Sequence, residues 1–198
     1  NKQGKKNYTF ALNLEKQRIE ISEIKNPRLT RRNAQLIKVV LDNGEVIRCT
    51  LDHLFMLRDG SYKKAKELKP QDSLMPLYTE LYNGKGDPNL KEYEIIYQPL
   101  QDKWEFAHHL ADGWNLENRI YKRNEGRIRH HKDFNKLNNN PENIQRIQWN
   151  QHWKLHKEVA GWRHRNDAGY VKKLGEGRKK FWSDPKNRQR ISMRLRIQ

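Results

Sequence analysis

Four histidines in the second half of the chain have the type and spacing needed for chemistry on phosphate esters. His130 and His131 are adjacent in a predicted strand, residues 127–131, so their side chains should point in opposite directions. His152 and His156 are four residues apart in a predicted helix, which places both imidazoles on one face. The imidazoles of His130, His152 and His156 could bind one divalent cation. His131 could then take a proton from water near neutral pH, and a base with a cation is the minimum required for phosphodiester hydrolysis.

The elements that must position these histidines can be predicted from the residues between them. Residues 132–140 are polar and rich in asparagine, which favours a loop with turns. Residues 142–147 predict a short returning strand, and Asn150 is a candidate cap for the helix that follows. The predicted order is therefore strand, loop, strand and helix, with imidazoles on the first and last elements.

Residues 104–157 resemble the HNH nucleases of the ββα-metal class, as found in homing endonucleases. The resemblance rests on the His-His pair, an Asn twelve residues after its second His, and a further His nine residues later. It implies that His131 is the general base and that Asn143 locks the loop and orients that base. It also implies that His130 and His152 are metal ligands.

The resemblance leaves the metal ion open in one respect. His156 is similar to an additional helix ligand of the colicin-like branch of this class. Homing members usually depend on magnesium, so Mg²⁺ or Mn²⁺ is the expected cofactor. Zn²⁺ remains open, because an imidazole-rich site suits zinc and other transition metals better than magnesium.

The first third of the chain predicts β-structure. Residues 36–41 and 45–50 are apolar or β-branched runs separated by Asp-Asn-Gly, and Asn-Gly between two such runs is the strongest short-range hairpin signal. Residues 54–57 and 73–77 predict two further short strands, and residues 62–68 predict about one helical turn.

Thr50 and His53 could polarise a backbone carbonyl at the exit of the second strand; the alternative is that both hydrogen-bond to the backbone of a turn. Residues 39–77 resemble the Hint domain of inteins, in which a Thr-x-x-His motif assists the acyl shift at the N-terminal splice junction. The chain does not start with Cys or Ser and does not end with His-Asn. We therefore expect Thr50 and His53 to be a vestigial splicing motif in a splicing-incompetent remnant.

The charge of the chain indicates a polyanionic partner, of which nucleic acid is the first candidate, and the resemblance to HNH nucleases implies double-stranded DNA. The formal net charge is +17, of which +10 lies in residues 153–198 and only +2 in residues 101–152. Residues 170–182 and 187–197 predict two helices in this basic tail, and the alternative is a solvated tail without a fixed register on DNA. The candidate DNA-binding residues are Lys132, Lys136, Arg146, Arg178, Lys179, Lys180, Arg188 and Arg190.

Composition excludes several other classes of protein. A single cysteine, Cys49, excludes an internal disulfide framework and a zinc site built from several thiolates. The sequence has no apolar run long enough for a membrane span and no recognisable signal peptide. We expect a cytoplasmic protein of a bacterial or phage-infected cell, a monomer or weak dimer with no membrane partner and no small-molecule cofactor.

The sequence as a whole predicts an α+β protein. A β-rich, partial Hint module is expected at residues 1–82, an HNH nuclease core at 83–157 and a basic helical tail at 158–198. The predicted function is that of a metal-dependent homing endonuclease that cuts duplex DNA at a specific site. One alternative is a protein-splicing element, an intein fragment whose nuclease is a passenger. Another is a nucleic-acid-binding protein with a degenerate nuclease fold.

Overall fold

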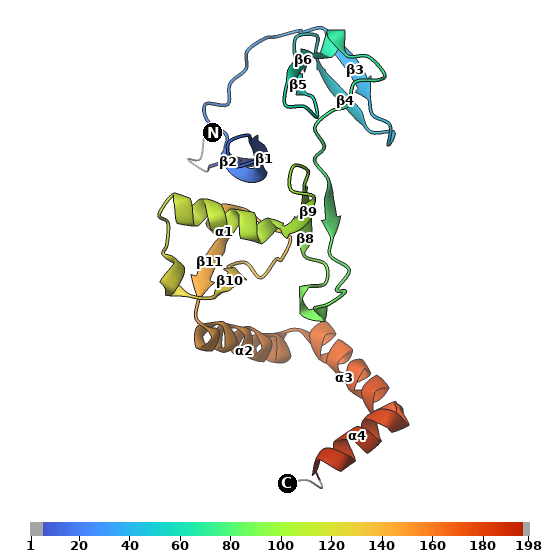
Figure 1. The fold of residues 1–198 in the computed structure, drawn as a ribbon. Coiled ribbons are helices and arrows are strands. Elements are labelled where there is room, and N and C mark those ends of the chain that lie inside the picture. The colour runs from blue at the N-terminus through green and yellow to red at the C-terminus, as the bar shows by residue number, and fades with distance from the viewer. Residues whose placement is uncertain (1–5, 196–198) are drawn as a thin grey trace. The chain divides into compact units, whose positions relative to one another are not determined.

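The computed structural model describes residues 6–195, which combine several small sheets with four α-helices and agree with the predicted α+β class (Figure 1). The described residues divide into two compact units. The first holds the chain up to Glu125 together with Arg129–Arg146, and the second holds Gly126–Ile128 together with the chain from Ile147 onward. The predicted domain boundaries at 82/83 and 157/158 stay predictions.

The predicted hairpin in the first third is confirmed. β3 (Leu36–Val40) and β4 (Val46–Thr50) are antiparallel, and Val40 lies opposite Val46 at the turn end. Gly44 has a φ of +85°, a conformation that residues with a side chain rarely adopt. The Asn-Gly pair therefore marks the turn correctly.

The next segment is shorter in regular structure than the sequence indicates. β5 (Leu54–Met56) pairs with β6 (Tyr62–Lys64), so part of the expected helical turn is a strand. The strand predicted at residues 73–77 is reduced to one isolated bridge, between Leu57 and Leu74. Short 3₁₀ turns lie at Ala65–Glu67, Pro88–Leu90, Arg123–Glu125 and Pro141–Asn143.

The first unit contains a hairpin that the sequence did not predict. β1 (Tyr8–Asn13) and β2 (Arg18–Glu23) pair along their full length (Figure 1). Their apolar side chains pack against α1 (Ala107–Glu117). The core of this unit combines Ile19 and Ile21 from β2 with apolar side chains of α1 and of two further strands. Its buried members are Ile19, Ile21, Ile96, Ala107, Leu110, Ala111 and Ile144.

A three-stranded sheet, β7 (Thr79–Leu81), β8 (Glu94–Gln98) and β9 (Lys103–Phe106), contributes to the same core. α1 begins at Ala107, directly after β9 ends. The fully buried Gln98 side chain connects β8 to the hairpin, because it accepts from Ile19 N at 2.6 Å and donates to Ile19 O at 3.1 Å. A buried amide satisfied on both sides in this way holds the hairpin in place.

The predicted strand–loop–strand–helix order is present along the chain. β10 (Ile128–His131) and β11 (Ile144–Ile147) form a two-stranded sheet, and α2 (Trp149–Asn166) follows. α2 begins after Gln148 instead of Asn150, because Gln148 N donates to the Gln151 side chain at 2.9 Å.

The second unit is mainly helical. α3 (Ala168–Ser183) and α4 (Pro185–Leu195) follow α2, and Asp167 and Asp184 cap them by accepting from backbone N–H groups at 2.8 Å. Both helices predicted in the tail are therefore confirmed within the described residues, although residues 196 and 197 of the second lie outside them. Among the described helices, none combines the length and apolar character needed to cross a membrane.

Candidate functional site

The loop between β10 and β11 is held by the Asn143 side chain. Its amide donates to Asp133 Oδ1 at 2.9 Å and to Asn138 O at 2.8 Å, and its oxygen accepts from Asp133 N at 3.1 Å. Hydrogen bonds from Asn138, the loop backbone and Asn143 lower the pKa of the Asp133 carboxyl below its usual value. The Asn143 side chain thus joins both ends of the loop, and the catalytic role expected of it stays a prediction.

His131, the predicted base, is buried at the end of β10 and has one defined polar partner. Its Nε2 lies 3.1 Å from Asn139 Oδ1, and Asn139 Nδ2 donates to the Glu94 carboxylate at 2.9 Å. An ionised carboxylate can only accept, so the Asn139 amide must turn its NH₂ toward Glu94 and its oxygen toward His131. His131 is therefore protonated on Nε2 in its neutral form, which leaves the lone pair on Nδ1.

The two adjacent histidines of β10 face different neighbours. The His130 ring meets Phe134 edge-on with centroids 4.9 Å apart, whereas the His131 ring lies 5.8 Å from Tyr93 and 5.7 Å from His108. This difference is what alternation along a strand predicts. His130 and His131 therefore contact different residues, which separate roles for the two side chains require.

The structure adds a second pair of histidines beside His131. His108 and His109 lie in the first turn of α1 with ring centroids 4.4 Å apart, and neither is among the residues for which a role is expected from the sequence. Burial, reinforced by the positive charge that His109, His131 and Arg129 would add, lowers the pKa of His108 to about 3. Burial likewise lowers the pKa of His109 to about 4. The same His-His doublet that identified residues 130 and 131 could have pointed to this pair.

Protonation of His108 should make the fold sensitive to mild acid. A histidine whose folded pKa lies below its unfolded value of 6.5 contributes stability that is fully present above pH 6.5 and is lost as pH falls toward 3. We expect the free energy of unfolding to fall by up to about 1.4 kcal/mol per pH unit in this window from His108 alone. Urea unfolding of the His108→Gln variant should show a flatter dependence on pH, whereas the exposed-histidine variant His164→Gln should match the unmodified protein. Parallel curves for all three proteins would contradict the assignment.

The two helix histidines of the predicted metal site come together on α2, in the second unit. The rings of His152 and His156 have centroids 4.4 Å apart, and Trp149 lies 5.7 Å from His152. Burial and then the neighbouring His156 lower the pKa of His152, which favours the neutral form that binds metals. The third predicted ligand, His130, belongs to the first unit.

A buried ion network holds the strands that carry these residues. Asp112 on α1 accepts from Arg146 Nε at 2.7 Å and Nη2 at 2.5 Å, and from Arg129 Nε at 2.9 Å. Tyr121 OH also donates to Asp112, at 3.0 Å. Burial tends to raise the pKa of Asp112, but hydrogen bonds from Arg146 and Arg129 outweigh it and the pKa is lowered. The predicted DNA contact of Arg146 does not fit this placement, because its side chain is only 6% exposed and is bound to Asp112.

The other candidate DNA-binding residues lie nearer to solvent. Lys132 Nζ donates to Glu142 O at 2.8 Å, and Lys136 Nζ pairs with Glu92 at 2.8 Å. The first contact is to a main-chain carbonyl and the second is a surface ion pair, which is usually weak. A DNA phosphate could therefore take the place of the present partner of either lysine. The five tail residues are exposed on α3 and α4: Arg178, Lys179, Lys180, Arg188 and Arg190.

Thr50 and His53 lie at the turn that follows β4. His53 N donates to Thr50 O at 3.1 Å, and the exposed His53 ring meets Phe55 edge-on with centroids 5.1 Å apart. A hydrogen bond from the Thr50 side chain is the main cause that lowers the pKa of the exposed Asp52. The turn is thus closed by a backbone hydrogen bond, the Thr50 side chain bonds to Asp52, and the His53 ring is exposed; the role of the two side chains stays a prediction.

Comparison with known proteins points to one family over almost the whole chain. The model of the intein splicing domain family matches residues 2–183. The B subunit of DNA gyrase from Synechocystis sp. (strain ATCC 27184 / PCC 6803 / Kazusa) is 41% identical over 196 residues, which are 98% of this chain and 18% of that protein. The chain therefore spans less than a fifth of the length of this relative. No solved structure matches the chain.

Proposed function

Because the chain belongs to the intein splicing domain family, we propose that it forms part of a protein-splicing element that also carries a DNA-cleaving unit. The observation that carries this proposal is the family match over residues 2–183, which includes both the Thr50–His53 turn and the histidine-rich region. This favours the splicing element over a splicing-incompetent remnant. The latter expectation depended on the first and last residues, and a chain that spans 18% of its relative does not decide that point.

The proposed splicing role belongs to the turn after β4. Thr50 is half-buried at the strand end and His53 is exposed beside it, so a scissile carbonyl could approach both side chains from solvent. Two donors aimed at such a carbonyl would stabilise the negative charge that develops on its oxygen during an acyl shift. We further propose that the host protein is the B subunit of a DNA gyrase, since the matching relative carries that name.

Expression of the complete reading frame around this chain tests the splicing proposal. We expect joined host protein and an excised segment, both identified by mass spectrometry. His53→Ala should slow the appearance of joined product by about 10²–10³-fold, the usual cost of removing one group that stabilises developing charge. The control variant His164→Ala, at an exposed position of α2, should splice as the unmodified protein does. Unspliced precursor from the unmodified frame would contradict the proposal.

The second candidate function is hydrolysis of double-stranded DNA at a specific site. It is favoured by the oriented His131, the loop fixed by Asn143 and the paired imidazoles on α2. His130, His152 and His156 would hold a divalent cation, and their donor atoms fit such an ion because neutral imidazoles are common metal ligands. The cation would stabilise negative charge on the phosphate. Mg²⁺ or Mn²⁺ is expected from the homing enzymes that the region resembles, and three imidazoles keep Zn²⁺ as a third ion to assay.

The chain's own residues would perform the remaining steps of this reaction. Nδ1 of His131 would accept a proton from the attacking water, and the Asn139–Glu94 pair would hold the ring in the required tautomer. Lys132, Lys136 and the exposed cations of α3 and α4 would bind phosphates of duplex DNA. DNA cutting would be a separate activity from splicing, because the two sets of residues lie on different elements.

A further inference from the structure

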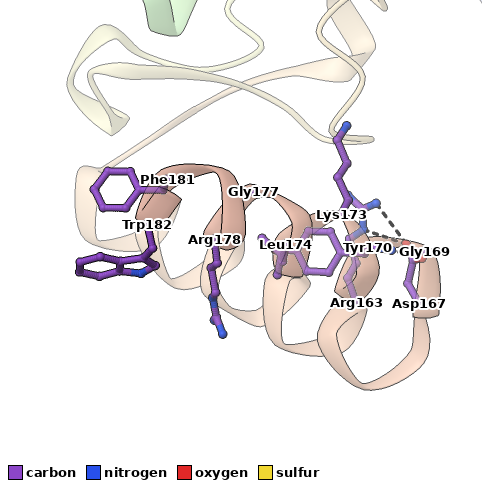
Figure 2. A pocket seen from close by; sticks show the side chains of 10 residues that line it. All are labelled: Arg163, Asp167, Gly169, Tyr170, Lys173, Leu174, Gly177, Arg178, Phe181 and Trp182. Atoms are coloured by element: carbon purple, nitrogen blue, oxygen red, sulfur yellow. Dashed lines mark hydrogen bonds and ion pairs between the residues drawn. The ribbon is translucent and has the colours of Figure 1, made fainter. Parts of the chain in front are cut away.

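A hollow runs along α3 in the second unit and is separate from the histidine-rich region. It has a volume of about 720 Å³, within the range of sites that hold small organic groups. Tyr170, Leu174, Phe181 and Trp182 supply its apolar lining. In Figure 2 the rings of Phe181 and Trp182 lie at one end of α3 and that of Tyr170 toward the other, with Leu174 between them.

A glycine interrupts the apolar stripe that lines the hollow. Tyr170, Leu174, Gly177 and Phe181 follow one another at helical spacing, so they share one face of α3. Glycine weakens a helix relative to alanine, and a Cβ added at Gly177 would meet no atom within 4 Å. Packing within the described residues therefore does not require a glycine here. Without a side chain at this position, a ligand in the hollow can approach the helix backbone closely.

Positive charge surrounds the apolar lining. Arg163, Lys173 and Arg178 line the hollow, within the part of the chain, residues 153–198, that carries a net charge of +10. The one carboxylate among the lining side chains, that of Asp167, is bound to Arg163 at 3.1 Å and to the start of α3. A ligand that combines a flat apolar ring with negative charge would therefore complement this surface.

We propose that the hollow binds single-stranded DNA, with one base against the aromatic rings and the neighbouring phosphates on Lys173 and Arg178. Aromatic rings within a basic groove are the usual means of binding unpaired strands. The Trp182 side chain is 49% exposed and so offers a ring face to a base. A paired base in duplex DNA is stacked on both sides and could not enter a concave site of this kind. The inference rests on the proposed cleavage of DNA by this protein. It adds an unpaired DNA strand to the ligands of the protein.

Two glycines of α3 provide a matched test. Gly177→Leu would place a side chain in the hollow, whereas Gly175→Leu adds the same side chain at a residue that does not line it, where a Cβ also meets no atom within 4 Å. Both changes should raise helix content, as circular dichroism would show. Binding of the full chain to a fluorescently labelled oligothymidylate would be followed by anisotropy. We expect about tenfold weaker binding for Gly177→Leu, the loss of one stacked base, and unchanged binding for Gly175→Leu.

A charge variant gives a second measurement that does not depend on the glycines. Lys173→Gln should reduce the slope of log affinity against log salt by about 0.7, the value for one phosphate contact on a single strand. Equal binding by the two leucine variants, an unchanged slope for Lys173→Gln, or binding to duplex but not to oligothymidylate would overturn the inference. Cleavage of target duplex is scored separately. Cutting without oligothymidylate binding would overturn this inference alone, and binding without cutting would overturn only the nuclease proposal.

Discussion

Replacing His131 by alanine should lower the rate of the proposed DNA cleavage by about 10²–10⁴-fold, the usual contribution of a general base. The reason lies in the tautomer: Asn139 engages Nε2, so Nδ1 is the atom that can accept a proton from water. The measurement is the conversion of supercoiled plasmid carrying the candidate target, with Mg²⁺, Mn²⁺ or Zn²⁺ in parallel. A chelator should abolish cutting by the unmodified protein, because the proposed cation would stabilise charge on the phosphate.

Controls separate loss of the base from loss of the fold. His131→Ala should bind the target in a gel-shift assay as tightly as the unmodified protein does, and His164→Ala should cut at the unmodified rate. Asn139→Ala should cut more slowly with unchanged target binding, since the base is present but no longer oriented. Equal cutting by the His131→Ala protein and the unmodified protein would refute the assignment of the base. Cutting that survives chelation would refute the metal.

The features that the sequence predicted correctly are local. The hairpin of β3 and β4 follows from an Asn-Gly turn between β-branched runs, and both the turn and the runs are contiguous in the sequence. The helices α3 and α4 follow from periodicity and from the Ser-Asp-Pro stop between them. Each of these signals lies within about twenty residues and needs no distant partner.

The features that the sequence missed depend on distant partners. The hairpin of β1 and β2 has a turn without the Asn-Gly signature, and it is held by packing on α1 and by Gln98, which is 79 residues from Ile19. Glu94 and Asn139 act on His131 only after the loop after β10 approaches β8. A single sequence gives no information about which of several glutamates or asparagines will form such a pair.

Arg146 is another residue whose partner could not be identified from the sequence alone. As an arginine in the HNH-like region of a basic protein it was a reasonable candidate for a phosphate contact. In the fold its guanidinium makes two bonds to the Asp112 carboxylate, a bidentate geometry that arginine favours. The residue type indicates that Arg146 binds an anion. Only the tertiary structure identifies that anion as the Asp112 carboxylate.

Asp112→Ala should therefore destabilise the first unit strongly, by about 3–5 kcal/mol, the range for removing one partner of a buried ion pair. The variant would leave Arg146, 6% exposed, without its carboxylate and would release Arg129 and Tyr121 as well. Because α1, β10 and β11 each contribute to this network, His131 and the Asn143 loop should lose their fixed positions. Urea unfolding gives the change in free energy, and the plasmid assay should show reduced cutting at temperatures where the variant remains partly folded.

Glu92→Ala is the matched control, because it breaks an exposed pair with Lys136 and should cost no more than about 1 kcal/mol. The pH dependence gives a further check on Asp112. Its folded pKa is lowered, so its contribution is present above the unfolded pKa of about 3.9 and is lost as pH falls through the folded pKa. The stability difference between the unmodified protein and Asp112→Ala should thus stay constant from pH 7 to about 5 and shrink below about 4. Similar losses for Asp112→Ala and Glu92→Ala would show that the buried network does not hold the site.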